Sequence, residues 1–416
     1  MRIRRQRAAA ALLALVFFFG RIVLAQEAVQ KLGEIDTSYY TPPESTEPYS
    51  NSNTAGPIRN VILLIGDGMG LSETTLAHLI AGGAVGKLHL ERLPVTGIVW
   101  TNASDTLVTD SAAASTALAG GVRTKKGVIG LSPEGGRVLT LSEAAKQKGM
   151  ATGLVVTSSI TDATPAGFVA HVPSRRDEID IALDMRKSGT DILLGGGRSY
   201  WIPESVPGGK RKDGRDLIAE LEALGYGIPR NAEELAVAKE SKLLGLFEND
   251  ALTTLPPEPS LASMTAKAIE ILAKNKKGFF LMVEGSEIDF AGHKHDSGEV
   301  VRQTLLFDMA VKTAMEFAEK DGLTLVIVIA DHETGGLVLI DGKLSGKDME
   351  VTWTTKYHTP TPVMLYAFGP GSLAFTGVEH HVDVSRKIAQ ALGITDFPRV
   401  TSGAKTIEEL ATSTKR

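Results

Sequence analysis

The chain has 416 residues, of which 43% are hydrophobic and 22% charged, and its formal net charge is −5. This globular composition excludes a wholly disordered chain, and an acidic chain without a basic block is not expected to bind nucleic acid. The absence of cysteine excludes disulfides, thiolate metal sites and a cysteine nucleophile, so any metal must be held by His, Asp, Glu or hydroxyl groups.

The first 25 residues have the pattern of a secretory signal peptide. Four arginines precede an apolar run over residues 8–20, and Val23 and Ala25 stand at −3 and −1 of a cleavage point before Gln26. The alternative is an uncleaved anchor, but this run would rise only about 20 Å as a helix, against roughly 30 Å of hydrocarbon core. We predict cleavage, export to the periplasm or the medium, and no stable membrane insertion afterwards.

Residues 26–57 are polar and without sustained periodicity, and we expect a linker or flexible arm before a catalytic domain at 58–416. Beyond residue 58, short apolar runs alternate with helical patterns. Strands are expected at 61–65, 154–157, 191–194, 279–283, 323–330 and 363–368. Helices are expected at 111–119, 140–148, 177–187, 214–224, 261–274 and 300–319.

This alternation predicts an α/β fold with a mostly parallel central sheet and helices on both faces, in three layers. Residues 201–258 are Pro- and Gly-rich around a short helix, and we expect them to decorate the sheet. In such a sheet, ligands bind at the carboxyl ends of the strands, so the residues that follow the strands are the first candidates for chemistry.

Two candidates follow the early strands. Asp67 lies between Gly66 and Gly68 directly after the first strand, although such a sequence is more often a simple turn. Ser111 follows Asp110 at the start of an alanine-rich helix, where either residue could serve only as a cap. In the functional interpretation the Ser111 hydroxyl lies at a helix N-terminus, which favours an anion, and a nearby metal ionises it.

Three further candidates follow the strand at 154–157. Asp162 and Thr164 offer oxygen donors, and Arg175 lies 13 residues after Asp162. A guanidinium fork suits two phosphate oxygens, although a lone arginine is more often a surface charge.

The later strands end in metal-binding residue types. Glu284 stands on the end of the strand at 279–283, and Asp289 and His293 are one helical turn apart, as a chelate needs. Asp331 and His332 close an apolar strand, where charge is costly unless it is paired or bound to metal. His358 precedes the last strand. Mixed Asp and His donors suit zinc, and oxygen-only donors suit magnesium.

In this order, these motifs resemble the alkaline phosphatase family in its compact bacterial form. The resemblance runs from about Ile58 to Leu392 and includes the stretches DILLGGG at 191–197 and KGFF at 277–280. It implies a phosphate monoester hydrolase that works through a phosphoserine on Ser111 with two zinc ions and one magnesium ion. Inorganic phosphate is then expected to inhibit as the product, and a homodimer is allowed without being required.

The resemblance also implies a role for each residue. Asp67 bridges one zinc and the magnesium. The shell of that zinc, on which Ser111 acts, is completed by Asp331 and His332. The second zinc is held by Asp289, His293 and His358. Magnesium is held by Thr164 and Glu284, with Asp162 acting through water. The phosphoryl oxygens are held by Arg175, which Asp110 orients.

Some features depart from the pattern or leave it open. Phe290 follows Asp289 where some relatives carry Lys, His or Trp, and only 25 residues separate His332 from His358, too few for a large crown insertion. A phosphodiesterase of the same superfamily and a catalytically silent metal- or phosphate-binding relative are the alternatives. The remaining candidates for metal binding, His295 and the pair His380-His381, are expected to be surface residues.

Overall fold

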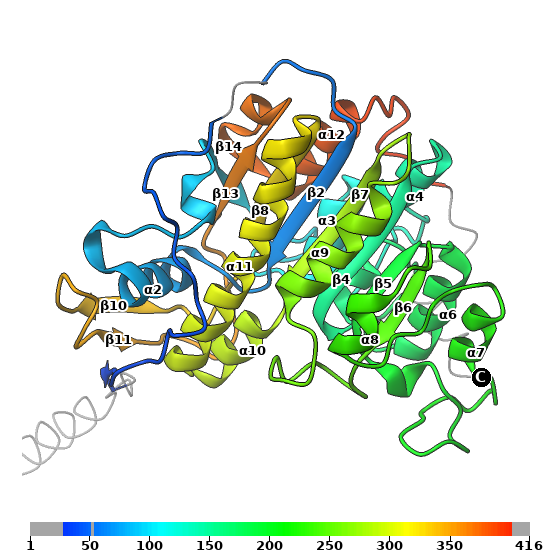
Figure 1. Ribbon diagram of the computed structural model, residues 1–416, viewed down its shortest axis with the longest axis horizontal. Coiled ribbons are helices and arrows are strands. Elements are labelled where there is room, and N and C mark those ends of the chain that lie inside the picture. Colours follow the sequence, from blue (N-terminus) through cyan, green and yellow to red (C-terminus); the bar gives the residue numbers. More distant parts are fainter. Residues whose placement is uncertain (1–27, 51–53, 402–416) are drawn as a thin grey trace, which may run out of the picture.

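The computed structural model describes residues 28–50 and 54–401 (Figure 1). The predicted signal peptide therefore lies outside the described residues. Within these ranges, no helix combines the length and the apolar character that crossing a bilayer requires.

The described chain forms a central sheet of nine strands (Figure 1). From edge to edge the strands are β14 (Gly377–His380), β3 (Val95–Trp100), β13 (Val363–Phe368), β8 (Thr324–Ala330), β2 (Asn60–Gly66), β7 (Phe279–Gly285), β4 (Ala151–Ser159), β5 (Ile192–Gly196) and β6 (Leu243–Leu246). Only β13 runs antiparallel to its neighbours within this sheet; the other pairs are parallel. The predicted mostly parallel sheet is confirmed.

The middle of the sheet is buried on both faces. Leu63 of β2 lies opposite Met282 of β7 and Ile327 of β8, and all three are fully buried. Such strands carry apolar residues at every position because helices cover both faces. One face is covered by α9 (Leu261–Leu272) and α11 (Ser297–Asp321), and the other by α3 (Ser111–Gly120), α4 (Leu141–Gln147) and α12 (His381–Ala391) (Figure 1).

Several elements were not expected. The prediction that residues 201–258 only decorate the sheet is wrong for β6, which pairs with β5 at the sheet edge. Its four residues are interrupted by Gly245, too short a run to show a pattern. The helix expected at 214–224 is shorter, α7 (Leu217–Glu222), because Asp216 caps it and Gly225 turns with φ +87° just beyond its end.

The remaining helices are α2 (Leu71–Gly82), α5 (Ala163–Ala166), α6 (Glu178–Ser188), α8 (Ala232–Val237) and α10 (Glu287–Lys294). Short helical turns are η2 (Gly83–Val85), η3 (Leu90–Arg92), η4 (Arg198–Tyr200) and η5 (Ser372–Phe375). Two small sheets complete the described fold, with strands β1 (Gln30–Lys31), β10 (Val338–Asp341) and β11 (Glu350–Thr352) in one, and β9 (Glu333–Thr334) and β12 (His358–Thr359) in the other.

Residues 28–50 lie along the domain as an arm. Strand β1 pairs antiparallel with β11. The Tyr40 hydroxyl donates to Asp308 Oδ2 of α11 at 2.7 Å, and the Tyr49 ring packs edge-on against Phe368 of β13. The arm is thus held by both backbone pairing and buried aromatic side chains.

Candidate active site

The candidate residues gather where parallel strands end. Gly66 of β2 pairs with Gly285 of β7 and with Ala330 of β8. Glu284 therefore lies on one neighbouring strand end, while Asp67 and Asp331 begin the segments that follow β2 and β8. The topology alone brings these three carboxylates to one edge of the sheet.

A tight turn after β2 shapes the centre of this edge. Gly68 has φ +68°, and its backbone N–H donates to Asp331 Oδ1 at 3.0 Å. A Cβ at this position would lie 2.7 Å from Thr334 Oγ1 and 2.9 Å from the Asp289 Cα. Only glycine fits both the backbone angle and the space, so the turn lets the backbone approach the metal-ligand candidates closely.

Ser111 begins the fully buried helix α3. Asp110 is its N-cap, and Asp110 Oδ1 accepts from the backbone N–H groups of Ala113 and Gly127, both at 3.1 Å. Ser111 is 3% exposed, and its Oγ lies 3.4 Å from His332 Nε2. The hydroxyl is thus held at a helix N-terminus beside a ring nitrogen, where negative charge is favoured.

One histidine cluster consists of Asp289, His293 and His358, whose ligand atoms all lie within 4.8 Å of one another. His293 Nδ1 lies 2.6 Å from the Lys356 carbonyl oxygen, and His358 Nδ1 lies 2.9 Å from that of Thr109. A carbonyl only accepts, so both Nδ1 atoms carry hydrogen, and in the neutral rings both Nε2 atoms present lone pairs. Those two Nε2 atoms are 3.3 Å apart. This is the arrangement by which outer carbonyls orient metal-binding imidazoles.

The ligand atoms of a second group, Asp67, Asp289 and His332, also lie within 4.8 Å of one another. His332 Nε2 lies 3.6 Å from Asp67 Oδ1 and 3.2 Å from Asp331 Oδ2, yet neither oxygen has a hydrogen-bond partner. A nitrogen and two oxygens that converge without hydrogen bonds to one another suit a shared cation. Asp289 belongs to both groups and places them side by side.

The third set of candidates is also buried. Glu284 is 1% exposed with Oε2 lacking a partner, and Thr164 is 1% exposed with Oγ1 lacking one. Helix α5, which carries Thr164, packs against β7, which carries Glu284. Asp162 caps α5 by accepting from the Ala163 N–H.

Arg175 stands beside these groups. Its Nη1 donates to Asp110 Oδ2 at 3.3 Å and its Nη2 to Asp162 Oδ1 at 3.0 Å. Burial lowers the pKa of Arg175, but Asp162, Asp110 and Asp67 raise that pKa further, so the guanidinium stays charged. The side chain is 30% exposed, which leaves part of it open to a ligand.

The electrostatics of the protein atoms alone are unfavourable for so many carboxylates. Burial raises the pKa of Asp67 well above its usual range, that of Glu284 to about 8 and that of Asp331 to about 7. Burial and neighbouring cations hold the pKa of His332 well below its usual range, so this ring is neutral. Burial also opposes ionisation of Asp289, but hydrogen bonds that His293 and His358 donate from Nε2 when these rings are protonated lower its pKa well below the usual range. A multivalent cation would allow all these oxygens to ionise together.

Some residues that hold the site residues in place are not among those predicted from the sequence. The Thr334 hydroxyl donates to Asp289 Oδ1 and lies 3.3 Å from His332 Nδ1, so it ties the two groups together. The carbonyls of Thr109 and Lys356 fix two histidine rings. The polar residues that follow β8 could have indicated Thr334 as a site residue. Backbone carbonyls are present at every position, so no sequence pattern could have indicated which of them support the site.

The other histidines do not join the site. His295 stacks on Trp353 with centroids 5.1 Å apart, and its Nε2 lies 2.8 Å from the Thr355 carbonyl oxygen. His381 is 2% exposed and bonds to the Ala330 carbonyl, so the expectation of a surface residue is wrong there. The sequence shows the polar pair His380-His381 but not that α12 turns the second ring inward.

The comparisons with known proteins agree with this geometry. The family model "Alkaline phosphatase" matches residues 58–347 of the chain. The chain belongs to the alkaline phosphatase family. It is accordingly an enzyme, a phosphoric monoester hydrolase, and the predicted membership is confirmed.

Members of the alkaline phosphatase family resemble the chain over most of its length. Alkaline phosphatase 3 of Bacillus subtilis (strain 168) is 33% identical, over 84% of this chain and 92% of that protein. Streptomycin-6-phosphate phosphatase of Streptomyces griseus is 33% identical, over 91% and 99%. The structure of alkaline phosphatase from the Antarctic bacterium TAB5 is 34% identical with a TM-score of 0.74, over 82% of this chain and 100% of that one. The Thermus thermophilus alkaline phosphatase structure reaches a TM-score of 0.77 at 27% identity, over 87% and 97%.

Proposed function

We propose that the chain hydrolyses phosphate monoesters in two steps, through a phosphoserine on Ser111, with two zinc ions and one magnesium ion as cofactors. The observation that carries this proposal is the convergence of buried, unpartnered oxygens and histidine lone pairs around the Ser111 hydroxyl. The unpartnered atoms are Asp67 Oδ1, Asp331 Oδ2, Glu284 Oε2 and Thr164 Oγ1; burial has removed their water, and no partner among the described residues replaces it.

The donor chemistry fits these ions. Zinc prefers imidazole nitrogen with carboxylate oxygen. Asp289, His293 and His358 offer such a set, and Asp67 and Asp331 offer another around His332 Nε2. Magnesium prefers oxygen ligands with some water, as Glu284, Thr164 and Asp67 offer, with Asp162 acting through water. When bound, such ions stabilise the charge that develops on the attacking and leaving oxygens.

The protein's own groups then position the reaction. Ser111 Oγ attacks the phosphorus atom from the N-terminus of α3, where the helix dipole favours negative charge. Arg175 holds two phosphoryl oxygens with its guanidinium fork, while Asp110 and Asp162 keep that fork in place. Two successive in-line displacements predict retention of configuration at phosphorus. Inorganic phosphate offers the same oxygens to Arg175, so it acts as a product inhibitor.

We further propose that residues 1–25 are a signal peptide and that the mature enzyme is exported to the periplasm or the medium. The basic start, short apolar run and small residues before Gln26 support this proposal. N-terminal sequencing of the protein recovered outside the cytoplasm should begin at Gln26. An intact N-terminus there would contradict it.

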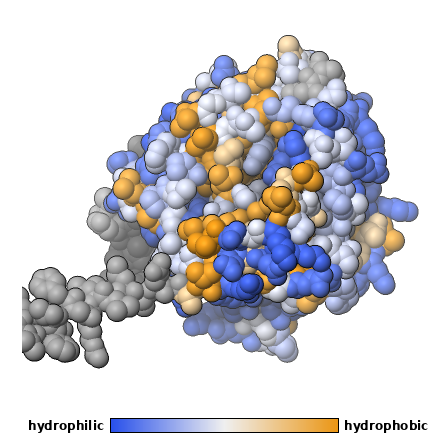
Figure 2. Space-filling model, turned by 90° about the vertical axis from the view of Figure 1, so that its left-hand side faces the viewer, coloured by the Kyte–Doolittle hydropathy of each residue, from blue (hydrophilic) through white to orange (hydrophobic). Residues whose placement is uncertain are grey.

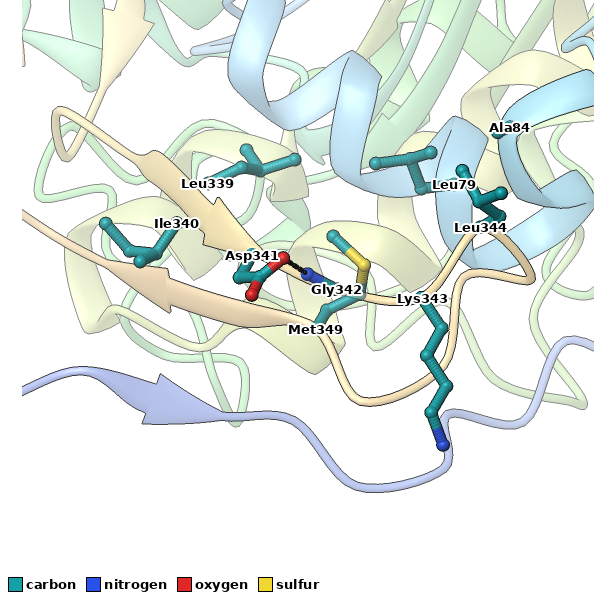
Figure 3. Close-up of a pocket in the computed structure, with 9 residues that line it drawn as sticks. All are labelled: Leu79, Ala84, Leu339, Ile340, Asp341, Gly342, Lys343, Leu344 and Met349. Carbon is teal, nitrogen blue, oxygen red and sulfur yellow. Dashed lines mark hydrogen bonds between the residues drawn. The ribbon is translucent and has the colours of Figure 1, made fainter.

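A homodimer is proposed on the face formed by α2 and the β10–β11 hairpin. Hydrophobic side chains gather on this side of the molecule (Figure 2). A pocket of about 210 Å³ between α2 and the hairpin is lined by Leu79, Leu339 and Met349 (Figure 3). Leu344 at its rim is 84% exposed and nearby Val85 is 87% exposed. Protrusions and a pocket on one face permit self-complementary contact between two copies.

Sedimentation velocity tests this proposal. We expect Leu344→Asp to convert a dimer into a monomer, while Leu224→Asp, at a 60% exposed position on another surface, leaves the dimer intact. A monomeric unaltered protein would remove the proposal.

Hydrolysis of p-nitrophenyl phosphate and of its bis-ester by residues 26–416 tests the function. Monoester turnover should dominate, disappear with EDTA and return with zinc and magnesium. Dominant bis-ester turnover would make the protein a phosphodiesterase, and metal binding without any turnover would make it a silent relative.

A further inference from the structure

Two side chains outside the proposed reacting groups tie together the segments that carry Asp162 and Arg175. Thr161 directly precedes Asp162, and Glu178 begins α6 three residues after Arg175. The Thr161 hydroxyl donates to Glu178 Oε2 at 2.7 Å. The 3.0 Å bond from Arg175 to Asp162 joins the same two segments, so the Thr161–Glu178 bond is a second tie beside it.

The neighbouring side chains determine which group donates in the Thr161–Glu178 hydrogen bond. Thr161 is fully buried, and its Oγ1 lies 2.7 Å from Ser159 Oγ. Thr161 gives its one hydrogen to the carboxylate, so Ser159 must be the donor in the other bond. Gly197, with φ +89°, packs directly against Ser159. A Cβ at position 197 would lie 2.1 Å from Ser159 Oγ, so no larger residue fits there. The Thr161 hydroxyl therefore has one orientation available.

Glu178 is held from its other side as well. Burial raises the pKa of Glu178, while hydrogen bonds with Thr161 and Tyr200 act to lower that pKa. Lys210 Nζ lies 4.2 Å from the Tyr200 ring centroid and 2.9 Å from Asp250 Oδ1. The carboxylate thus links the end of β4 to the segments that follow β5 and β6.

We infer that Glu178 and Thr161 are positioning residues for Arg175, which fix the guanidinium relative to Ser111. This inference rests on the proposed function, in which Arg175 holds phosphoryl oxygens. The Asp162 side chain is itself 29% exposed, so its bond to Arg175 alone does not fix the loop. A displacement of about 1 Å in such a group is enough to weaken transition-state contacts strongly.

Inhibition by inorganic phosphate measures the effect in the metal-loaded enzyme. We expect Glu178→Ala and Thr161→Val each to raise the inhibition constant about 3- to 10-fold, which matches the net contribution of one ordinary hydrogen bond. Glu178→Gln keeps an acceptor oxygen and Thr161→Ser keeps the hydroxyl, so both should stay within about 2-fold of the unaltered enzyme. Metal content should be unchanged in all four variants.

A double-mutant cycle separates positioning from general stability. If Glu178 acts through Arg175, Glu178→Ala should add nothing to the inhibition constant in an Arg175→Ala background. Glu220→Ala is the matched control, because Glu220 anchors the same helix α6 by its 2.8 Å ion pair with Arg186. This control should lower the melting temperature without changing phosphate inhibition.

The outcomes are distinguishable. If Glu178→Ala leaves phosphate inhibition unchanged, or if its effect persists without Arg175, the positioning role is overturned. If Arg175→Ala itself leaves phosphate inhibition unchanged, the proposed role of Arg175 fails first. An Arg175 effect without a Glu178 effect retains the proposed function and removes only this inference.

Discussion

Replacing Gly68 with alanine tests whether the turn after β2 is specific to the metal-ligand geometry. Gly68 combines φ +68° with contacts that leave no room for a Cβ. The new methyl group would lie 2.7 Å from Thr334 Oγ1 and 2.9 Å from the Asp289 Cα. Thr334 donates a hydrogen bond to Asp289, so relief of the clash must move Asp289, a ligand of the proposed zinc pair.

The expected cost has two parts. A left-handed backbone angle costs a non-glycine residue about 1–2 kcal/mol. Crowding in a close-packed site costs about 1–3 kcal/mol. We therefore expect a loss of about 2–5 kcal/mol in the free energy of unfolding, together with weaker zinc binding because Asp289 is displaced.

Gly322→Ala is the matched control. Gly322 has φ +66° at the end of α11, and a Cβ there would meet nothing within 4 Å. This variant should show only the backbone cost of about 1–2 kcal/mol and full metal content. Urea unfolding of the EDTA-treated proteins measures the intrinsic cost, and metal analysis of the loaded proteins measures binding. If Gly68→Ala costs no more than Gly322→Ala and keeps its zinc, the steric reasoning is wrong.

Other contacts of the described fold lead to four further predictions. Ser111→Ala should abolish phosphoserine formation and monoester turnover at unchanged metal content, and near-normal turnover would exclude this nucleophile. EDTA should both stop turnover and lower the melting temperature, because the ions bind only the folded site; an unchanged melting temperature would argue against structural coupling. Tyr40→Phe should destabilise the fold by about 1.5–3 kcal/mol, because the fully buried Asp308 loses one of its donors, whereas Tyr39→Phe, at a 36% exposed ring, should be near neutral. Burial lowers the pKa of His381 from 6.5 to about 4, so the unfolded chain binds the extra proton between these values. The contribution of His381 to stability should therefore fall by about 3 kcal/mol as the pH drops through that window, and this contribution should appear as the difference in pH dependence between the unaltered protein and His381→Asn, both treated with EDTA.

The sequence predicted the central strands well because these strands are buried on both faces. An uninterrupted apolar run such as that of β8 is too short for a buried helix and too apolar for a surface loop, and the residue types after it stand out by contrast. The edge strands are different. Strand β3 alternates buried and exposed residues over only six positions, and β6 has four residues with a glycine among them. Such runs carry too little pattern, and only pairing with a neighbour makes them strands.

The candidate site divides in the same way. Asp67, Glu284 and Asp331 could be placed together because parallel strands deliver their carboxyl ends to one edge. The hydrogen-bond partners of His293 and His358 could not be predicted, since the Lys356 and Thr109 carbonyls are identical in kind to every other carbonyl of the chain. The distances from those carbonyls to His293 and His358 exist only once the loops are folded.

These carbonyls also explain how the protein atoms alone define the geometry of the site. Each fixes one imidazole as the Nδ1–H form and leaves the Nε2 lone pair directed at the other ring's Nε2, 3.3 Å away. In the neutral rings, two lone pairs face each other at this distance and repel. The fold therefore maintains an arrangement that is unfavourable for the protein atoms alone and favourable around a cation. Under the proposed function, the stability given up at this edge would be recovered when metal binds, and folding, metal content and catalysis would be linked in one site.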